Sequence, residues 1–248
     1  MAAGRVVFLG SGDAFSAGGR HQAGYLVQTP GSVSLLDCGA STLTAMKQYG
    51  IDTAPIDQIL ISHLHGDHFA GIPFLLLEYT YERPRQRPLR IMGPPGTEER
   101  VRSLFSIAYK EPAAKPLPFS LEFIELLPDV PVSLGELRID PFRVPHQEKE
   151  ISLGFRLNVA GRSIAYSGDT GWTEELITRS RHADLFICEC SYFETRQPFH
   201  IDYPRLAEQR SRFAAKRVIL THLGREVLAR RGEVEMELAS DGLAVEID

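Results

Sequence analysis

In the hexapeptide His63-Leu64-His65-Gly66-Asp67-His68, three imidazoles and one carboxylate fall within six residues. The whole chain has only eight histidines in 248 residues, so chance is a poor explanation for this cluster. An apolar run, Ile59-Leu60-Ile61, precedes the hexapeptide, and a second apolar segment follows it. Imidazole and carboxylate are the ligands that suit zinc and similar divalent metals. We therefore interpret this stretch as half of a site for two metal ions.

Three later segments repeat one design, in which an apolar strand ends at a candidate metal ligand: His146, Asp169 and His222. Strand ends that share one edge of a sheet converge on a single cleft. His63 and His65 stand two apart on an extended segment and project to the same side. We assign the seven candidate ligands to a first metal (His63, His65, His146), a second metal (Asp67, His68, His222) and a bridge between them (Asp169).

The rest of the pattern alternates strands and helices with no linker or low-complexity segment. We expect strands over 5–9, 25–27, 33–37, 57–62, 89–92, 121–127, 137–144, 151–159, 163–166, 184–189 and 217–221. Helices are expected over 42–49, 69–81, 97–109, 173–179 and 203–215, and a terminal hairpin or strand over 233–247. These elements predict one domain over residues 1–248. Its fold class is α/β (α+β), a four-layer αββα sandwich of two mixed sheets flanked by helices.

Composition excludes several classes of function. The net charge is -5, which argues against a globally basic nucleic-acid surface. Three cysteines without framework spacing fit a reducing compartment, and we expect a cytoplasmic protein with no membrane association. The loop Gly10-Ser11-Gly12-Asp13 lacks the lysine of a phosphate-binding loop and is interpreted as a turn that lines a cleft. The proline-rich segment 112–118 is expected to be a loop that could border the site.

The hexapeptide, followed in order by His146, Asp169 and His222, resembles the metallo-β-lactamase superfamily over nearly the whole chain. The resemblance implies the αββα fold and two divalent metal ions, most often Zn²⁺, with Mn²⁺ or Fe²⁺ as alternatives. Members that hydrolyse β-lactams have cysteine where this chain has Asp169. The sequence is therefore more similar to the hydrolase and phosphodiesterase branches.

Further stretches resemble the tRNA 3′-processing endoribonucleases (tRNase Z). These are Phe8-Leu9-Gly10-Ser11-Gly12, Arg20-His21, Leu36-Asp37-Cys38-Gly39 and Cys188-Glu189-Cys190-Ser191. In that family a histidine at the place of His200 lies near the scissile phosphate, and a glutamate at the place of Glu189 partners it. Strand alternation puts Glu189 on the face opposite Cys188 and Cys190.

The chain departs from that family between His146 and Asp169, where a short hairpin replaces the long arm that grips tRNA. Relatives without the arm include phosphodiesterases that act on small or cyclic phosphodiesters. The expected partner is an anionic phosphodiester, either a small molecule or an RNA 3′ end. A homodimer is an open alternative, because dimers are common among the relatives.

The resemblance implies a dinuclear metal-dependent phosphodiesterase that uses a metal-bridging hydroxide as nucleophile. The expected catalytic residues are Asp67, which holds or deprotonates the water, His200, which donates a proton to the leaving oxygen, and Glu189, which orients His200. Two alternatives stay open. One is a hydrolase of a thioester, lactone or sulfate ester on the same scaffold, and the other is a non-catalytic metal-binding module.

Overall fold

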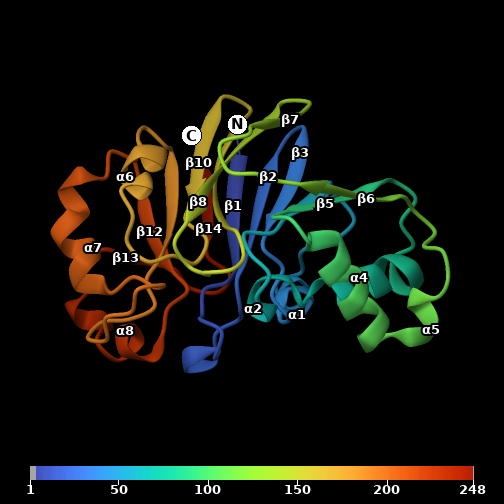
Figure 1. Cartoon of the computed structure of the whole chain (residues 1–248), viewed down its shortest axis with the longest axis horizontal. Coiled ribbons are helices and arrows are strands. Elements are labelled where there is room, and N and C mark those ends of the chain that lie inside the picture. The colour runs from blue at the N-terminus through green and yellow to red at the C-terminus, as the bar shows by residue number, and fades with distance from the viewer. Residues whose placement is uncertain (1–3, 248) are drawn as a thin grey trace.

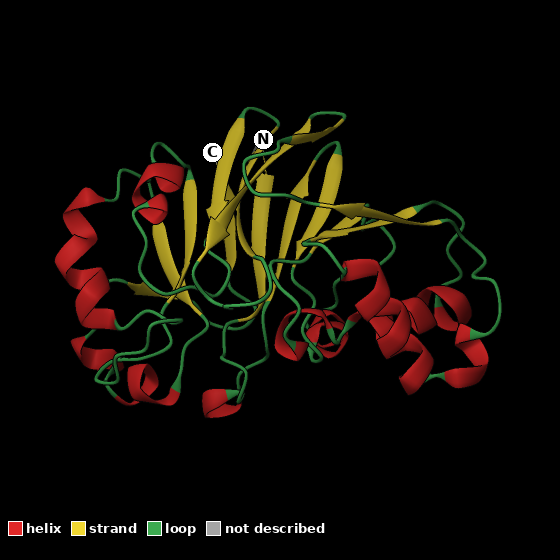
Figure 2. Ribbon diagram, viewed as in Figure 1, coloured by secondary structure: helices red, strands yellow, loops and turns green. Residues whose placement is uncertain are grey.

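The computed structural model describes residues 4–247, which form two seven-stranded sheets packed face to face (Figures 1 and 2). The first sheet has the order β14-β1-β2-β3-β4-β5-β6 and the second the order β13-β12-β11-β10-β9-β8-β7. Both sheets are mixed, with parallel and antiparallel pairs. The predicted fold class is confirmed.

The first sheet contains six consecutive strands and one C-terminal strand. Its members are β1 (Gly4–Gly10), β2 (Gly24–Thr29), β3 (Ser32–Leu36), β4 (Gln58–Leu60), β5 (Leu89–Gly93), β6 (Leu121–Glu125) and β14 (Ala244–Ile247). Its outer face is covered by α1 (Thr42–Gln48), α2 (Gly66–Phe69), α3 (Ile72–Leu77), the π-helix η2 (Glu78–Glu82), α4 (Thr97–Ala108) and α5 (Lys110–Ala113). A short 3₁₀ turn, η1 (Ala17–Gly19), lies on the loop after β1.

The second sheet is built from β7 (Val132–Leu134), β8 (Leu137–Val144), β9 (Ser152–Val159), β10 (Arg162–Tyr166), β11 (Leu185–Glu189), β12 (Val218–Thr221) and β13 (Glu237–Leu238). Its outer face is covered by α6 (Glu175–Ser180), α7 (Tyr203–Gln209), η3 (Arg210–Arg212), α8 (Arg225–Ala229) and η4 (Arg231–Glu233). In Figure 1 these helices lie on the left, whereas α1 to α5 lie at the lower centre and right.

The apolar face of each strand explains the layers. Alternate residues of both sheets, such as Phe8, Tyr25, Phe155 and Ile187, meet in a central cluster of fully buried side chains. The opposite faces of the same strands form two further clusters with the helices. Because both sheets are covered on both sides, the strands carry little polar surface, and polar groups concentrate in the loops at the strand ends.

Three expectations about elements were wrong in detail. The helix expected over 69–81 is divided into α2, α3 and η2, because the backbone at Gly71 packs against Gly39 O and Pro73 opens a new helix. Of the two alternatives for the terminal segment, the strand is confirmed and the hairpin is wrong, since β13 joins the second sheet and β14 joins the first. The segment 112–118 begins within α5 and packs over the first sheet, away from the predicted ligands.

No helix within residues 4–247 has the length and apolar character needed to cross a membrane.

Candidate metal centre

The seven predicted ligands meet at one edge of the sandwich, where α2 lies at the lower centre of Figure 1. His63 follows β4 by three residues, and His65 is the residue that precedes α2. Asp67 and His68 lie within α2. The others follow β8 (His146), β10 (Asp169) and β12 (His222). The fold thus places five of the predicted ligands on loops that follow rigid strands and the other two, Asp67 and His68, on the short helix α2.

The first group comprises His63, His65 and His146, whose ring nitrogens can approach a common point. His146 Nε2 lies 3.0 Å from His65 Nδ1. The other nitrogen of His146, Nδ1, donates to the backbone oxygen of Phe199 over 2.9 Å. This bond fixes the ring and leaves Nε2 facing its neighbours.

The second group comprises Asp67, His68, Asp169 and His222. His68 Nε2 lies 3.2 Å from Oδ2 of both aspartates, and His222 Nε2 lies 3.3 Å from Asp67 Oδ2 and 3.2 Å from Asp169 Oδ2. Asp169 Oδ2 also lies 4.0 Å from His63 Nε2. Asp169 is therefore the residue that stands between the two groups.

Three buried atoms at this centre have no hydrogen-bond partner among the described residues: His63 Nε2, His68 Nε2 and Asp169 Oδ1. A buried polar atom without a partner costs about 1–3 kcal/mol. Three such atoms in one place are unusual for a folded protein. Divalent cations would supply the missing partners, and the imidazole and carboxylate donors fit zinc or a similar metal.

The local potential also favours cations. Burial lowers the pKa of His68, but the carboxylates of Asp169, Asp67 and Asp37 outweigh burial and raise this pKa well above its usual value. Burial raises the pKa of Asp169, but His222 and His68 outweigh it and hold this pKa well below its usual range. The Asp169 carboxylate is therefore ionised, as a metal ligand must be.

Asp37 supports the centre from beneath and is completely buried. Its carboxylate accepts hydrogen bonds from His68 Nδ1 over 2.7 Å, from Ser62 N and Oγ over 2.7 Å each, and from Tyr166 OH over 2.6 Å. The bond to His68 orients the imidazole so that Nε2 points at Asp67 and Asp169. Sequence reasoning noted Asp37 only as part of a motif and missed this role.

Glu189, which is buried, and His200, which is half-buried, form a pair beside the ligands. Glu189 is 1% exposed and lies at the end of β11, on the face opposite Cys188 and Cys190 as expected. His200 Nδ1 lies 3.1 Å from Glu189 Oε1. Burial lowers the pKa of His200, but the charge and hydrogen bond of Glu189 outweigh it and raise this pKa to about 9. His200 is therefore held as a cation.

The ring of His200 faces the candidate ligands. It stacks on His222 with centroids 5.6 Å apart and meets His146 edge-on at 4.8 Å. Ser191 connects the Glu189–His200 pair to the second ligand group, since its Oγ donates to Glu189 Oε2 over 2.7 Å and lies 2.9 Å from His222 Nδ1. Ser191 was quoted as part of a motif, but its contact with His222 was not foreseen.

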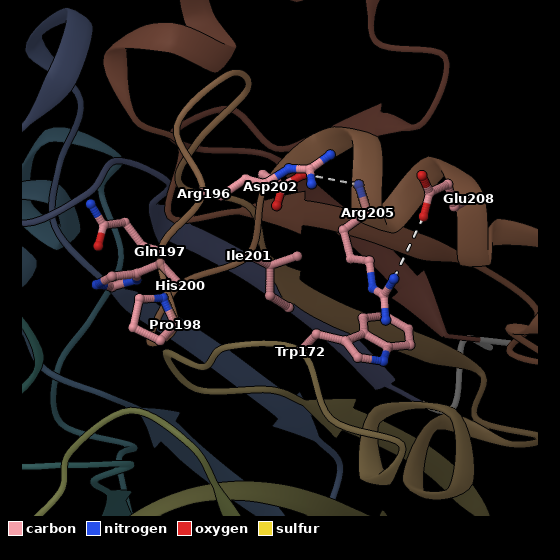
Figure 3. A pocket seen from close by; sticks show the side chains of 9 residues that line it. All are labelled: Trp172, Arg196, Gln197, Pro198, His200, Ile201, Asp202, Arg205 and Glu208. Atoms are coloured by element: carbon pink, nitrogen blue, oxygen red, sulfur yellow. Dashed lines mark hydrogen bonds and ion pairs between the residues drawn. The ribbon is translucent and has the colours of Figure 1, made fainter.

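A cavity of about 170 Å³ opens onto this centre. Its lining combines candidate ligands with residues of the loop after β1 and of the segment after β11: Asp13, Ala14, Phe15, His65, Asp67, Asp169, Ser191, Tyr192, His200 and His222. The expectation that the loop at residues 10–13 lines a cleft is confirmed by Asp13. A larger pocket of about 490 Å³ lies beside it and shares His200 with it (Figure 3).

Close backbone packing positions α2. A Cβ atom at Gly39 would lie 2.4 Å from the carbonyl oxygen of Asp67, so only glycine allows this approach. Cys38 N donates to His68 O over 2.7 Å in the same contact. The Asp37-Cys38-Gly39 stretch is therefore packed directly against the backbone of the hexapeptide.

A family model described as "Anti-Pycsar protein Apyc1" matches residues 5–242. A ribonuclease Z of Agathobacter rectalis is 30% identical over 244 residues, covering 77% of this chain and 78% of the relative. A ribonuclease Z of Methanothermobacter thermautotrophicus is 27% identical over 285 residues, covering 94% of this chain and 90% of the relative.

Among solved structures, the metallo-β-lactamase fold protein YhfI of Bacillus subtilis has a TM-score of 0.80 at 22% identity. The match covers 99% of this chain and 100% of the YhfI chain. This structural match supports the metallo-β-lactamase fold. The ribonuclease Z relatives place the sequence in the ribonuclease Z-like branch of that superfamily. The chain belongs to the anti-Pycsar protein Apyc1 family, a ribonuclease Z-like group within the metallo-β-lactamase superfamily of metal-dependent hydrolases.

Proposed function

We propose that the protein is a dinuclear metal-dependent phosphodiesterase. The single observation that carries the proposal is the pairing of His200 with Glu189 beside the two ligand groups. The metal ligands alone would allow several kinds of ester hydrolysis. A histidine held as a cation at the same cavity suits a substrate that carries negative charge before and during the reaction.

In this proposal His63, His65 and His146 would hold one ion, Asp67, His68 and His222 would hold the other, and Asp169, which lies between the two groups, would be shared. Zinc is the proposed metal, with manganese or iron(II) as alternatives. When bound, two such ions would lower the pKa of a water that serves as nucleophile and would provide positive charge for the phosphoryl oxygens.

The chain's own residues carry the proton transfers. Asp67 lies at the cavity and holds or deprotonates the attacking water. His200 donates the Nε2 proton to the leaving oxygen, because its Nδ1 is already engaged by Glu189. Glu189 keeps that ring charged and correctly rotated, and is itself fixed by Thr170 N and Ser191 Oγ.

The relatives' name, ribonuclease Z, makes RNA a candidate substrate. Three observations favour a small diester instead. The hairpin β9–β10 occupies the place of the arm. Arg85 is 5% exposed and donates to backbone oxygens, so it offers no surface charge to an RNA backbone. Arg20 is engaged by Ser11 Oγ and the carbonyl oxygen of Ala239.

The test is turnover of bis(p-nitrophenyl) phosphate by protein loaded with zinc or manganese. His200→Ala should retain its metal, measured by elemental analysis, and lose at least about 100-fold in kcat. His182→Ala is the matched control, since His182 is an exposed histidine outside the site. Normal turnover by metal-loaded His200→Ala would refute the assigned role.

A panel of substrates separates the alternatives. Cleavage of a thioester, lactone or sulfate ester with phosphodiesters untouched would select another hydrolase on this scaffold. Protein that binds metal but cleaves none of these substrates would indicate a non-catalytic metal-binding module.

A further inference from the structure

Glu226, the second residue of α8, binds a turn of the chain that the assigned reaction does not use. Its Oε2 accepts the backbone N–H groups of three consecutive residues, Phe193 over 3.0 Å, Glu194 over 2.8 Å and Thr195 over 2.9 Å. Its Oε1 accepts a further hydrogen bond from the Thr195 hydroxyl. Successive amides that converge on one anion form a nest, and such charge-assisted bonds fix the backbone of a turn. The backbone at residues 193–195 is therefore held by a carboxylate more than 30 positions later in the chain.

This turn belongs to the loop between β11 and α7, which carries His200 (Figure 3). The base of the loop is closed by two backbone hydrogen bonds, from Ser191 N over 3.1 Å and from Tyr192 N over 3.3 Å, both to the carbonyl oxygen of Ile201. His200 is the neighbour of Ile201, so these bonds connect the start of the loop to the residue beside the proposed acid. Glu226 fixes the residues that follow Tyr192, and the base of the loop carries this constraint to His200.

The same helix is connected to the metal centre, because α8 begins three residues after His222. Gly224, in the connecting segment, packs directly against the His200 loop. A Cβ atom at Gly224 would lie 2.1 Å from the carbonyl oxygen of Ser191. At the other end of α8, the guanidinium carbon of Arg230 lies 4.0 Å from the centre of the Phe193 ring. The segment after His222 therefore contacts the His200 loop from Ser191 through the turn that Glu226 binds.

The proposed acid and a candidate metal ligand lie face to face beside this contact. The rings of His200 and His222 are stacked, with centroids 5.6 Å apart and planes 9° from parallel. Glu226 connects the two segments on which these rings are carried. A proton donor must lie within about 2.6–3.2 Å of the oxygen that it protonates. Because a misplacement of 1 Å can cost about 100-fold in rate, the relative position of the two segments matters for proton transfer.

We propose that Glu226 is a positioning residue for the general acid, because it fixes the His200 loop against the segment that carries His222. The inference rests on the proposed phosphodiesterase function, which makes His200 the proton donor. Glu226 lines neither of the two cavities, so it acts through the loop and not through contact with substrate. Its carboxylate would then determine how well the protein expels leaving groups that need a proton.

Leaving groups distinguish this role from a general loss of stability. When the scissile P–O bond breaks, a basic phenoxide needs the Nε2 proton of His200, whereas the weakly basic p-nitrophenoxide departs without it. Glu226→Gln keeps the shape of the side chain but replaces one acceptor oxygen by an NH₂ group. It should lower kcat for methyl phenyl phosphate about tenfold and kcat for methyl p-nitrophenyl phosphate by less than about twofold, with KM unchanged for both.

Glu194→Gln is the matched control. Glu194 lies on the same turn and its side chain pairs with the same helix, through Arg230 at 2.6 Å, whereas the amides of the turn bind Glu226. The ratio of the two kcat values should equal the wild-type ratio in Glu194→Gln, and zinc content should be unchanged in both variants. Equal losses on the two diesters in Glu226→Gln, or no loss on either, would overturn the positioning role.

Hydrogen exchange gives a readout that needs no catalysis. The amides of Ser191 and Tyr192 are bonded to Ile201 O, and the amide of Tyr203 is bonded to Tyr192 O over 2.8 Å, so all three report on the base of the loop. In metal-loaded protein these amides should exchange at least about fivefold faster in Glu226→Gln than in the wild type, by mass spectrometry. An unchanged exchange rate would contradict the proposal even if kcat fell.

The two proposals fail in different ways. If exchange at the base of the loop accelerates but the wild-type protein cleaves neither diester, the phosphodiesterase proposal fails and the hold of Glu226 on the loop stands. If the wild-type protein cleaves both diesters and Glu226→Gln changes them equally, only the positioning role fails.

Discussion

Replacing Asp37 with asparagine tests how far the metal centre depends on the buried hydrogen bonds that orient His68. Asp37 is completely buried and accepts four hydrogen bonds, from His68, Tyr166 and two atoms of Ser62. Asparagine has nearly the same shape but offers one acceptor oxygen and one donor nitrogen. We expect Asp37→Asn to fold, with lower thermal stability and lower metal affinity than the wild type.

The expected loss of stability follows from the hydrogen bonds that Asp37 accepts. If the amide oxygen keeps the three side-chain donors, the amide nitrogen faces Ser62 N–H, and two buried donors oppose each other. That mismatch costs about 2 kcal/mol. The other three bonds lose an ionised acceptor, which costs about 2 kcal/mol in total. A loss of about 4 kcal/mol lowers the melting temperature by about 10 °C in a chain of this size. Loss of the oriented imidazole lowers metal affinity by about 10- to 100-fold.

Two assays separate these effects. Thermal unfolding in excess chelator measures the cost to the protein alone, and zinc content at limiting zinc measures affinity. Tyr166→Phe is the graded control, since it removes one donor to Asp37 without touching His68, and should cost about 1 kcal/mol. A melting temperature in chelator and a zinc affinity that both equal the wild-type values would refute this account of Asp37.

Three further outcomes are expected. Glu226 accepts from Thr195 Oγ1 and three backbone N–H groups, which lower its pKa to about 2. Its stabilisation is therefore present above about pH 4.5 and lost as pH falls toward 2. Glu226→Gln should cost about 1 kcal/mol at pH 7, after allowance for solvent screening, and much less at pH 3, by thermal unfolding in chelator. An equal cost at both pH values would contradict this. Gly39→Ala should displace Asp67 and lower diester turnover at least about tenfold, and unchanged turnover would disprove the close packing. Chelation of metal should lower the free energy of unfolding by about 4 kcal/mol relative to protein with metal at 1,000 times Kd, and added zinc that restored no stability would argue against a resident ion.

Sequence predicted the elements whose signals are local. The strand expected over 137–144 has the same bounds in the structure, and the hairpin that replaces the arm forms as expected. The placement of the candidate ligands was predictable because the hexapeptide, His146, Asp169 and His222 each follow an apolar strand, and such strand ends meet at one edge of the sandwich. The pairing of the two ligand groups came from spacing in the hexapeptide and agrees with the distances in the structure.

Features that depend on distant partners were not predictable in this way. Asp37 takes its role from His68, 31 residues away, and from Tyr166, 129 residues away. The break between α2 and α3 arises because Gly71 packs against the backbone at Gly39, a contact with no local signal. The helix α8 was missed, and its Glu226 is tied to residues 193–195, more than 30 positions earlier.

Backbone strain connects the centre to the stability of the fold. Asp37 has φ of 55° and His222 has φ of 54°, a left-handed conformation that is uncommon for residues other than glycine. Each such residue costs about 1 kcal/mol or more, and persists only where its surroundings fix it. For His222 those surroundings are Ser191 Oγ, at 2.9 Å from Nδ1, and the bond from Leu223 N to Ser11 O over 2.8 Å. The conformation turns His222 Nε2 toward Asp67 and Asp169, which a residue continuing the extended course of β12 could not reach. The geometry of the centre therefore requires strained backbone at His222. The segments after β1 and β11, whose hydrogen bonds stabilise this strained conformation, also contribute residues to the lining of the two cavities.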